Sequence, residues 1–411
     1  MLNGRLFGLV AALACAATSA GAQGQQRQRI ELPDGDGRQI VQVLCTQCHT
    51  LNNVANSGGY TRDGWRELIR SMVSMREARE DTVAAYLATH FPVKPRPEAV
   101  LVPGDATVVI REWMVPTLGS RPHDPAPGPD GSIWWTGQYA NVLGRLDPKT
   151  GALREYLLKT PDSGPHGLIA DKAGNIWYTG QGKRHVGKLD PLTGEVTEYQ
   201  MPDTAARGPH TPIFDQKGNL WFTLQSGMVG RIVPSTGEVR VVRTPTARTY
   251  PYGIAVNSQG IPWYVDFRGN RIGSVDPETM AIREYTLPDT GARPRRIAIT
   301  PDDVVWYTDY ARGYLGRFDP KTGAVREWPS PGGRQSRPYG IAATGNIVWY
   351  SESGVRPNTL VRFDPATEKF QTWTIPSGGG IVRHMMATPD GNLVLALSGV
   401  NRVALVEVGK D

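Results

Sequence analysis

The sequence lacks a strong excess of charge of either sign. Its 45 basic and 39 acidic residues leave a net charge of +6 over 411 residues. This mild balance does not indicate a phosphate-binding surface, so we expect no nucleic-acid partner. Long apolar runs are also lacking, because no stretch is long and apolar enough to cross a bilayer. We therefore expect no transmembrane segment.

The first 22 residues have the pattern of a cleavable signal peptide. Arg5 supplies the positive start, residues 6–17 form a short apolar stretch, and Ala20-Gly21-Ala22 matches an A-x-A cleavage site. The pattern predicts cleavage after Ala22 and an exported protein, either periplasmic or secreted.

Cysteine is scarce, which makes the pair that follows this leader informative. Without residues 1–22, only Cys45 and Cys48 remain of three cysteines. Cysteines at this spacing could form a redox disulfide or half of a zinc site. His49 decides between these interpretations, because C-x-x-C-H is the attachment signature of c-type haem, with both thiols bonded to the haem and the histidine on its iron. The sequence predicts one covalent haem c.

Short helices are predicted around this motif, within residues 30–92. Apolar residues recur at helical spacing in residues 36–44, in a segment that begins at the capping residue Thr61, and in residues 77–89. Three short helices around a haem would make a small all-α cytochrome c domain. Residues 93–104 contain several prolines and are predicted to be a linker.

The second iron ligand is expected from the same domain. Small class I cytochromes resemble this segment in a W-x6-M motif, here Trp65 and Met72, followed by a Tyr86-Leu87 helix. Met72 is the first candidate, Met75 is the alternative, and His90 is a weaker candidate. A methionine on iron raises the reduction potential, which suits an electron carrier.

The rest of the chain repeats with a period of 42–45 residues. Each unit contains four short strands separated by turn residues, which is typical of one propeller blade. The last unit lacks its outer strand, and residues 108–115 match the outer strands of other units. We therefore predict an all-β seven-bladed propeller over residues 105–411, closed by its N-terminal strand. One core position recurs in every unit: Trp134, Trp177, Trp221, Trp263, Trp306, Trp349 and Val394.

A second recurring position lies ten or eleven residues before each conserved tryptophan, where the innermost strand begins. Innermost strands line the central channel, so its occupants should form one ring. They are His123, His166, His210, Tyr252, Arg295 and Tyr339, and the seventh unit offers His384 after Arg383. The four histidines are candidate catalytic residues. Candidate ligand-binding residues are Tyr252, Arg295, Tyr339, Arg121 and Arg383. The alternative is that these side chains only bond neighbouring blades.

Charged residues are expected around the same channel. The position three residues after each conserved tryptophan carries an acid in three units, namely Asp266, Asp309 and Glu352. Arginines crowd the rim, at Arg121, Arg293, Arg295, Arg337 and Arg383. A mouth that is positive over much of its circumference favours an anionic ligand or an acidic protein.

Residues 105–411 resemble the streptogramin B (virginiamycin B) lyase family. The resemblance rests on first strands such as Pro165-His166-Gly167, second strands such as Trp177-Tyr178-Thr179, and a G-[KR]-[IL] third strand. It implies a lyase in which carboxylates hold a divalent cation, here Mg²⁺, while histidine moves a proton. The family places one of those acids two residues before a ring histidine. Here Gly164 and Gly208 stand at that position. This chain therefore has the ring histidines of the family but lacks the acids that accompany them.

Three functions follow as expectations. The first is electron transfer by haem c, coupled to a propeller that binds a small anionic substrate or a redox partner protein. The second is a Mg²⁺-dependent lyase, with Asp266, Asp309 and Glu352 holding the cation elsewhere in the ring. The third is a propeller that binds without turnover. The haem motif places electron transfer first.

Overall fold

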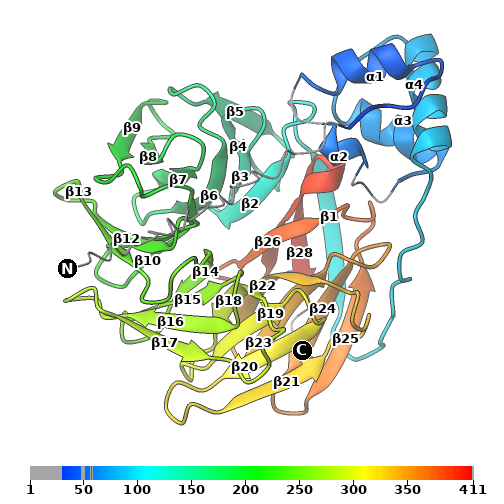
Figure 1. Ribbon diagram of the computed structural model, residues 1–411. Helices are drawn as coiled ribbons and strands as arrows, with labels where there is room; N and C mark the ends of the chain where they lie inside the picture. Colours follow the sequence, from blue (N-terminus) through cyan, green and yellow to red (C-terminus); the bar gives the residue numbers. More distant parts are fainter. Residues whose placement is uncertain (1–29, 48–50, 56, 58, 410–411) are drawn as a thin grey trace, which may run out of the picture.

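The computed structural model describes residues 30–47, 51–55, 57 and 59–409. The predicted signal peptide with its cleavage site after Ala22, and Cys48 and His49 of the predicted haem motif, lie outside these residues. The described chain consists of a helical module followed by a ring of sheets (Figure 1).

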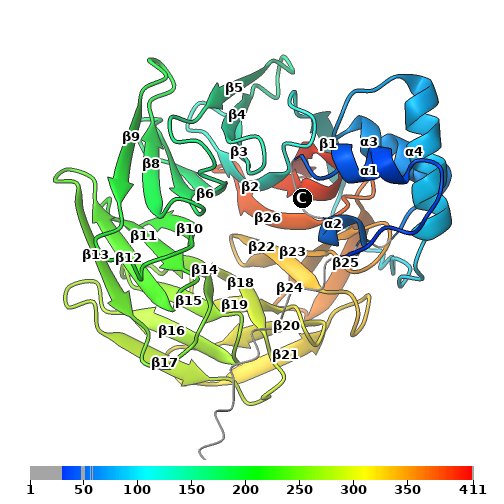
Figure 2. The ribbon, with the colours of Figure 1, turned by 45° about the horizontal axis from the view of Figure 1, so that its top comes forward.

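The ring is a seven-bladed β-propeller, as predicted, and each blade is a four-stranded antiparallel sheet (Figure 2). Innermost strands come first in each blade. Blades one to three are β2 (Pro122–Pro127), β3 (Ile133–Gly137), β4 (Val142–Leu146), β5 (Leu153–Leu157); β6 (Pro165–Ala170), β7 (Ile176–Gly180), β8 (His185–Leu189), β9 (Val196–Gln200); and β10 (Pro209–Phe214), β11 (Leu220–Leu224), β12 (Met228–Val233), β13 (Glu238–Arg243).

Blades four to seven follow the same order, except that the last takes its outer strand from the N-terminal side. They are β14 (Pro251–Val256), β15 (Pro262–Asp266), β16 (Arg271–Val275), β17 (Ile282–Thr286); β18 (Pro294–Ile299), β19 (Val305–Asp309), β20 (Tyr314–Phe318), β21 (Val325–Pro329); β22 (Pro338–Thr344), β23 (Ile347–Glu352), β24 (Thr359–Asp364), β25 (Lys369–Thr374); and β26 (Val382–Ala387), β27 (Leu393–Leu397), β28 (Arg402–Val408), β1 (Val108–Met114). Strand β1 pairs with β28 from Val108↔Val408 to Met114↔Arg402. This pairing closes the ring.

The blade cores are built on the repeated tryptophans. All six, and Val394 in the seventh blade, are at most 3% exposed. Most indole nitrogens donate to a side chain of the preceding turn, as Trp177 does to Asp171 at 3.0 Å and Trp221 to Asp215 at 2.9 Å. A buried indole N–H thus keeps a partner while its ring fills the core.

A glycine on the third strand makes room for an aromatic ring on the second. An added Cβ on Gly230 would lie 2.2 Å from the Phe222 ring, and one on Gly144 would lie 1.9 Å from Trp135. The same arrangement recurs in the second, fourth and fifth blades. In the sixth blade Val361 stands opposite Tyr350 instead, which is where the G-[KR]-[IL] pattern is lost.

In the part of the helical module that the structure describes there are four helices: α1 (Arg38–Leu44), α2 (Asn52–Ala55), α3 (Arg62–Arg70) and α4 (Glu77–His90). Thr61 caps α3 by accepting a hydrogen bond from the Gly64 amide at 3.1 Å. The buried core of the module includes Val41, Trp65, Ile69, Val83 and Leu87. None of the described helices is long and apolar enough to span a membrane.

The segment between the helices and the propeller lies against the sixth blade. Thr372 of β25 holds two of its residues, because its hydroxyl donates to the Val100 carbonyl and accepts from the Val102 amide, each at 2.7 Å. Arg356 bonds through its backbone to Pro97 and Ala99. The linker is therefore docked on the propeller, and the helices lie beside β1, β2 and β26 (Figures 1 and 2).

Candidate functional site

A β-bulge at the start of each innermost strand shapes the channel. Pro122 pairs with Gly137, but the next paired residue is Pro125, so His123 and Asp124 stand outside the ladder. The innermost strands of the second to sixth blades carry the same two-residue shift. In an ordinary strand successive side chains point to opposite faces of the sheet. The two bulge residues of each blade are not bound to this alternation.

The aromatic first bulge residues of neighbouring blades lie against one another with their rings tilted. His123 and His166 have ring centroids 3.7 Å apart, His166 and His210 are also 3.7 Å apart, and His210 and Tyr252 are 3.9 Å apart. The hydroxyls of Tyr252 and Tyr339 then share a hydrogen bond of 2.6 Å. The structure thus brings three of the four predicted histidines and both tyrosines together.

His384 does not occupy the ring position. In the seventh blade Val382 pairs with Leu397 and His384 already pairs with Ala396, so the bulge contains one residue, Arg383. Arg383 is therefore the equivalent of His123, and His384 is the equivalent of Asp124, one layer further along the channel. The expected ring of four histidines, two tyrosines and one arginine is corrected to three histidines, two tyrosines and two arginines.

The next layer holds an ion pair across the channel. Arg296 of the fifth blade donates to Asp124 of the first blade at 2.7 Å and to Thr211 of the third at 2.9 Å. Asp124 also bonds the Nδ1 atom of His123 at 2.8 Å. Arg296 and Asp124 are at most 1% exposed. Neither was predicted, although both directly follow a ring residue, at a position where other blades have glycine, such as Gly253 and Gly340.

Burial and nearby arginines keep the histidines neutral. Burial lowers the pKa of His166 well below its usual value, and Arg296, Arg383 and Arg121 lower it further. His123 and His210 have pKa values lowered in the same direction, again mainly by burial. Among the described residues, buried atoms without a hydrogen-bond partner include Asp124 Oδ2, His166 Nδ1, His210 Nε2 and His384 Nδ1. These atoms could accept or donate a bond to a ligand or water.

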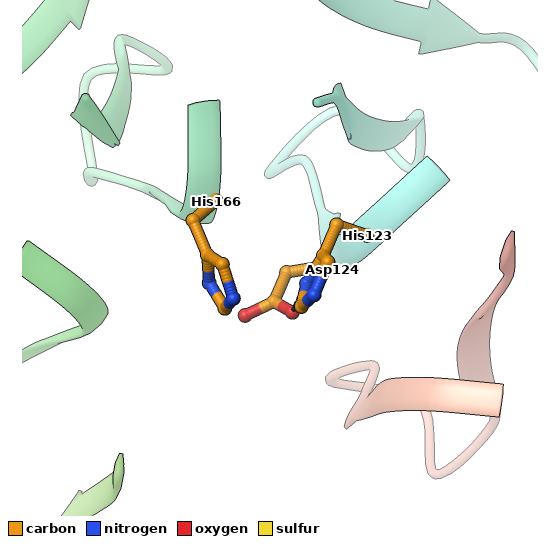
Figure 3. A group of neighbouring side chains, drawn as sticks. All are labelled: His123, Asp124 and His166. Atoms are coloured by element: carbon orange, nitrogen blue, oxygen red, sulfur yellow. Dashed lines mark hydrogen bonds and ion pairs between the residues drawn. The ribbon is translucent and has the colours of Figure 1, made fainter. Parts of the chain in front are cut away.

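His123, Asp124 and His166 lie close enough together to be ligands of one metal ion (Figure 3). One ligand atom from each lies within 4.8 Å of the other two. Two imidazoles and a carboxylate suit a transition metal better than Mg²⁺, which prefers oxygen ligands. Arg296 already pairs with the carboxylate, and burial raises the pKa of Asp124 to about 6 against the opposing effect of Arg296.

The three predicted acids on the opposite side hold loops rather than facing a shared site. Asp266 accepts hydrogen bonds from the Tyr250 and Arg268 amides at 2.7 and 3.0 Å. Asp309 accepts from the Arg293 amide and pairs with Arg312 at 2.6 Å. Glu352 accepts from Ser330, Gly332 and Thr359, each at 2.6 Å. A cation held jointly by these carboxylates is not supported, since each is already engaged in its own blade.

Arg295 lies in an aromatic cage. Its guanidinium is 3.6 Å from the ring centroid of Tyr339 and 4.3 Å from that of Tyr310, and it donates to the Tyr252 hydroxyl at 3.2 Å. Burial raises the pKa of Tyr339, but Arg295, Arg383 and Arg296 outweigh it and lower this pKa to about 8. The predicted ligand-binding residues Tyr252, Arg295 and Tyr339 thus form one packed cluster.

A cavity of about 450 Å³ lies between the helical module and the propeller. Its helical wall includes Cys45, Met72 and Met75, and its propeller wall includes Arg121 and Arg383. Burial raises the pKa of the Cys45 thiol to about 11. The volume falls in the usual range for cofactor sites.

His90 is placed elsewhere. Its ring packs against Tyr86 with centroids 4.5 Å apart, and it is not among the lining residues of the cavity. Of the three candidates for a second iron ligand, only the two methionines reach this space. The geometry does not choose between Met72 and Met75, because both line it.

Comparisons with known proteins agree on the propeller. A streptogramin B lyase structure is 26% identical, with a TM-score of 0.67 over 74% of this chain and 98% of that chain. Virginiamycin B lyase from Staphylococcus aureus is 22% identical, with a TM-score of 0.66 over 73% of this chain and 99% of that chain. Hydrazine synthase from Kuenenia stuttgartiensis shares the fold alone, at 14% identity and a TM-score of 0.59 over 71% of this chain and 96% of that chain.

No curated protein matches the chain. The virginiamycin B lyase family itself matches residues 105–344, which is more than half of the chain. The chain therefore belongs to the virginiamycin B lyase family.

Proposed function

We propose that the chain is an exported c-type haem protein whose helical module transfers electrons and whose propeller binds a small anionic substrate or a redox partner. The observation that carries this proposal is the cavity shared by the two parts. Cys45 of the C-x-x-C-H motif and both candidate methionines line it, although they are far apart in sequence. A thiol and thioethers on the wall of one largely apolar space fit a covalent haem.

The residues that would hold the group are Cys45 and Cys48 through thioether bonds, and His49 and Met72 on iron, with Met75 as the alternative to Met72. A bound haem would supply one-electron oxidation and reduction. Apolar side chains of the helical module, Trp65, Ile69 and Val83, line the same cavity and would shield a bound haem from water on that side. The docked linker keeps the site beside the propeller.

The propeller residues would handle the substrate and its proton. Arg121, Arg295 and Arg383 favour an anionic group, since arginine binds carboxylates and other oxyanions strongly. Burial lowers the pKa values of His123, His166 and His210 and keeps them neutral, so their imidazoles are available as bases. An anionic group bound beside them would raise these pKa values toward the range in which they accept a proton.

The test is the spectrum of the purified full-length protein. Covalent haem would be measured as the pyridine haemochrome of the denatured protein. His49→Ala should abolish stable ligation of the iron, and Met72→Ala should remove any sulfur-to-iron charge-transfer band. Loss of that band in Met75→Ala instead would assign Met75 as the ligand. Protein without covalent haem would contradict the proposal.

A second candidate function is a metal-dependent lyase like the streptogramin B lyase to which the chain is similar. The specific observation is the grouping of His123, Asp124 and His166 within 4.8 Å. Elimination of a cyclic depsipeptide would then depend on a cation held there. Metal analysis of wild type and His166→Gln, together with product absorbance with and without a chelator, would test it. Activity that is insensitive to the chelator would contradict this candidate.

A further inference from the structure

Two arginines of the propeller line the cavity that also holds Cys45 and Met72. Arg121 directly precedes β2, and Arg383 is the bulge residue of β26. Arg121 stacks over Tyr139, with 4.5 Å between its guanidinium and the ring centroid, and donates to the Tyr139 hydroxyl. Asn53 of α2 donates to the same hydroxyl at 3.2 Å. Arg121 is thus oriented at the contact between the two parts of the molecule.

The backbone at Arg121 is unusual for an arginine. Its φ is +56°, and the equivalent positions of the next two blades are occupied by Gly164 and Gly208, with φ of +56° and +66°. Glycine adopts this left-handed conformation easily, whereas a residue with a Cβ does so at a cost. Glycine would form the same turn at a lower cost. We therefore infer that an arginine is present at this position because its side chain has a function.

These arginines form no ion pair with a carboxylate of the described residues, although the charge of Arg383 reaches Asp124 and, against the larger effect of burial, lowers the pKa of that carboxyl. In the described part of the chain, no acidic side chain lies within ion-pair distance of Arg121 or Arg383, and the Nε atom of Arg383 is buried without a partner. Burial lowers the pKa of Arg121 to about 10, and the charge of Arg383 contributes to this. Two half-buried cations on the wall of one cavity, neither of them in an ion pair with any residue that the structure describes, make a site for an anion.

We propose that Arg121 and Arg383 bind carboxylates in this cavity, namely the two propionate groups of the haem. The inference rests on the proposed function, because it needs a haem on the helical module. It assigns Arg121 and Arg383 to the haem and leaves Arg295 for an anionic substrate. A guanidinium forms paired hydrogen bonds with a carboxylate, and two guanidiniums match two propionates. Since Arg383 belongs to the channel ring, the propeller would hold the anionic edge of the haem against its own ring.

The experiment is potentiometry of the full-length haem protein, compared with Arg121→Gln and Arg383→Gln. Each variant should keep its covalent haem but have a lower reduction potential, because a cation beside the haem favours the reduced state. Its potential should also become dependent on pH, since a propionate without its arginine protonates more easily. Arg184→Gln is the matched control, because Arg184 also has a left-handed backbone (φ +56°) but does not line the cavity.

Arg121→Lys keeps the charge but not the paired hydrogen bonds of a guanidinium, and it keeps the proposal testable if the glutamine variants fail to fold. It should give a potential between those of wild type and Arg121→Gln.

Acetate tests the other source of carboxylate. If the arginines hold a free carboxylate, acetate will lower the wild-type potential but not that of the variants, and this result would overturn the assignment to propionates. Unchanged potentials in both haem-bearing glutamine variants would also overturn it. Absence of haem from the wild type would instead contradict the proposed function.

Discussion

Arg296 and Asp124 meet in the middle of the propeller, although they come from the fifth and first blades. Both side chains are almost fully buried, and Arg296 also donates to Thr211 of the third blade. One guanidinium therefore connects three blades across the channel. A buried pair of this kind gains little over apolar packing, but leaving one partner unpaired is costly.

Asp124→Asn should destabilise the protein by about 3–5 kcal/mol, because Arg296 would keep its buried charge without a carboxylate. The free energy of unfolding from urea denaturation measures this. The matched control is the double variant Asp124→Asn/Arg296→Met, which removes both charges and should recover much of the loss. A loss below about 1 kcal/mol, the range of exposed ion pairs, would contradict the role assigned to this pair.

Protonation of His166 should couple stability to pH. Its pKa is lowered by burial and by the charges of Arg296 and Arg383, so the folded protein keeps the neutral form while the unfolded chain takes up a proton below pH of about 6.5. The stability contributed by neutral His166 is therefore complete above this pH, and it is lost as pH falls toward the folded pKa.

In His166→Gln, the slope of unfolding free energy against pH below about 6.5 should be smaller than in wild type by up to about 1.4 kcal/mol per pH unit. Urea denaturation between pH 8 and pH 5 measures both slopes. The raised pKa of Asp124 acts in the opposite direction but is common to both proteins. Parallel curves for wild type and variant would show that His166 takes up no more protons on unfolding than glutamine does.

Within a blade, the third strand requires a glycine at one position, just as the second strand requires a large buried side chain at the position of the tryptophan. The Phe222 ring lies over Gly230 so closely that an added Cβ would be 2.2 Å from it. A rigid ring held between two strands has no free rotamer into which it could move. The aromatic–glycine pair therefore sets how closely these strands pack.

Gly230→Ala should lower the free energy of unfolding by about 1–3 kcal/mol through overpacking. The same substitution in a Phe222→Leu background should cost less, because the smaller side chain leaves space for the methyl group. Thermal or urea denaturation of the four proteins gives the coupling between the two positions. Equal costs in both backgrounds would mean that the ring is not what excludes the methyl group.

The repeated features of the blades could be predicted, and the features unique to one blade could not. Tryptophan at one position per unit indicates a core that each blade builds from its own strands, and this prediction of a seven-bladed propeller is confirmed. Asp124 and Arg296 occur once each and meet only because the ring closes. His384 was misplaced because it lies ten residues before Val394, whereas Arg383 lies eleven residues before it, the spacing that the ring residues of the first five blades keep from their tryptophans. Asp266, Asp309 and Glu352 share a position, but each bonds its own loop.

At the scale of the whole molecule, the linker decides where the helical module lies. Thr372 fixes Val100 and Val102, Gln371 donates to the Ala106 carbonyl at 2.8 Å, and the Gly119 amide donates to the Ser71 carbonyl of the helical module at 2.7 Å. These bonds give the cavity two walls with a fixed separation. The cytochrome module itself stays a prediction, because Cys48 and His49 lie outside the described residues.

Thr372→Val should loosen the linker without unfolding either part. Loss of a hydroxyl bond worth about 1 kcal/mol should speed exchange of the Val102 amide about fivefold. Hydrogen–deuterium exchange of the peptides that cover residues 93–104 measures this. Thr372→Ser keeps the hydroxyl and is the matched control, so faster exchange in both variants would assign the effect to packing instead.

The pairing of β1 with β28 has a consequence for the order in which the protein can form. Val108 cannot pair until Val408 has been synthesised. A chain made from its N-terminus therefore carries an unpaired strand until almost all of its length has been made. Contacts this distant in sequence form slowly, and open strand edges favour association between chains during that interval. A chain that is shortened at its C-terminus would never lose these edges. Such truncations should aggregate even though most of their blades are intact.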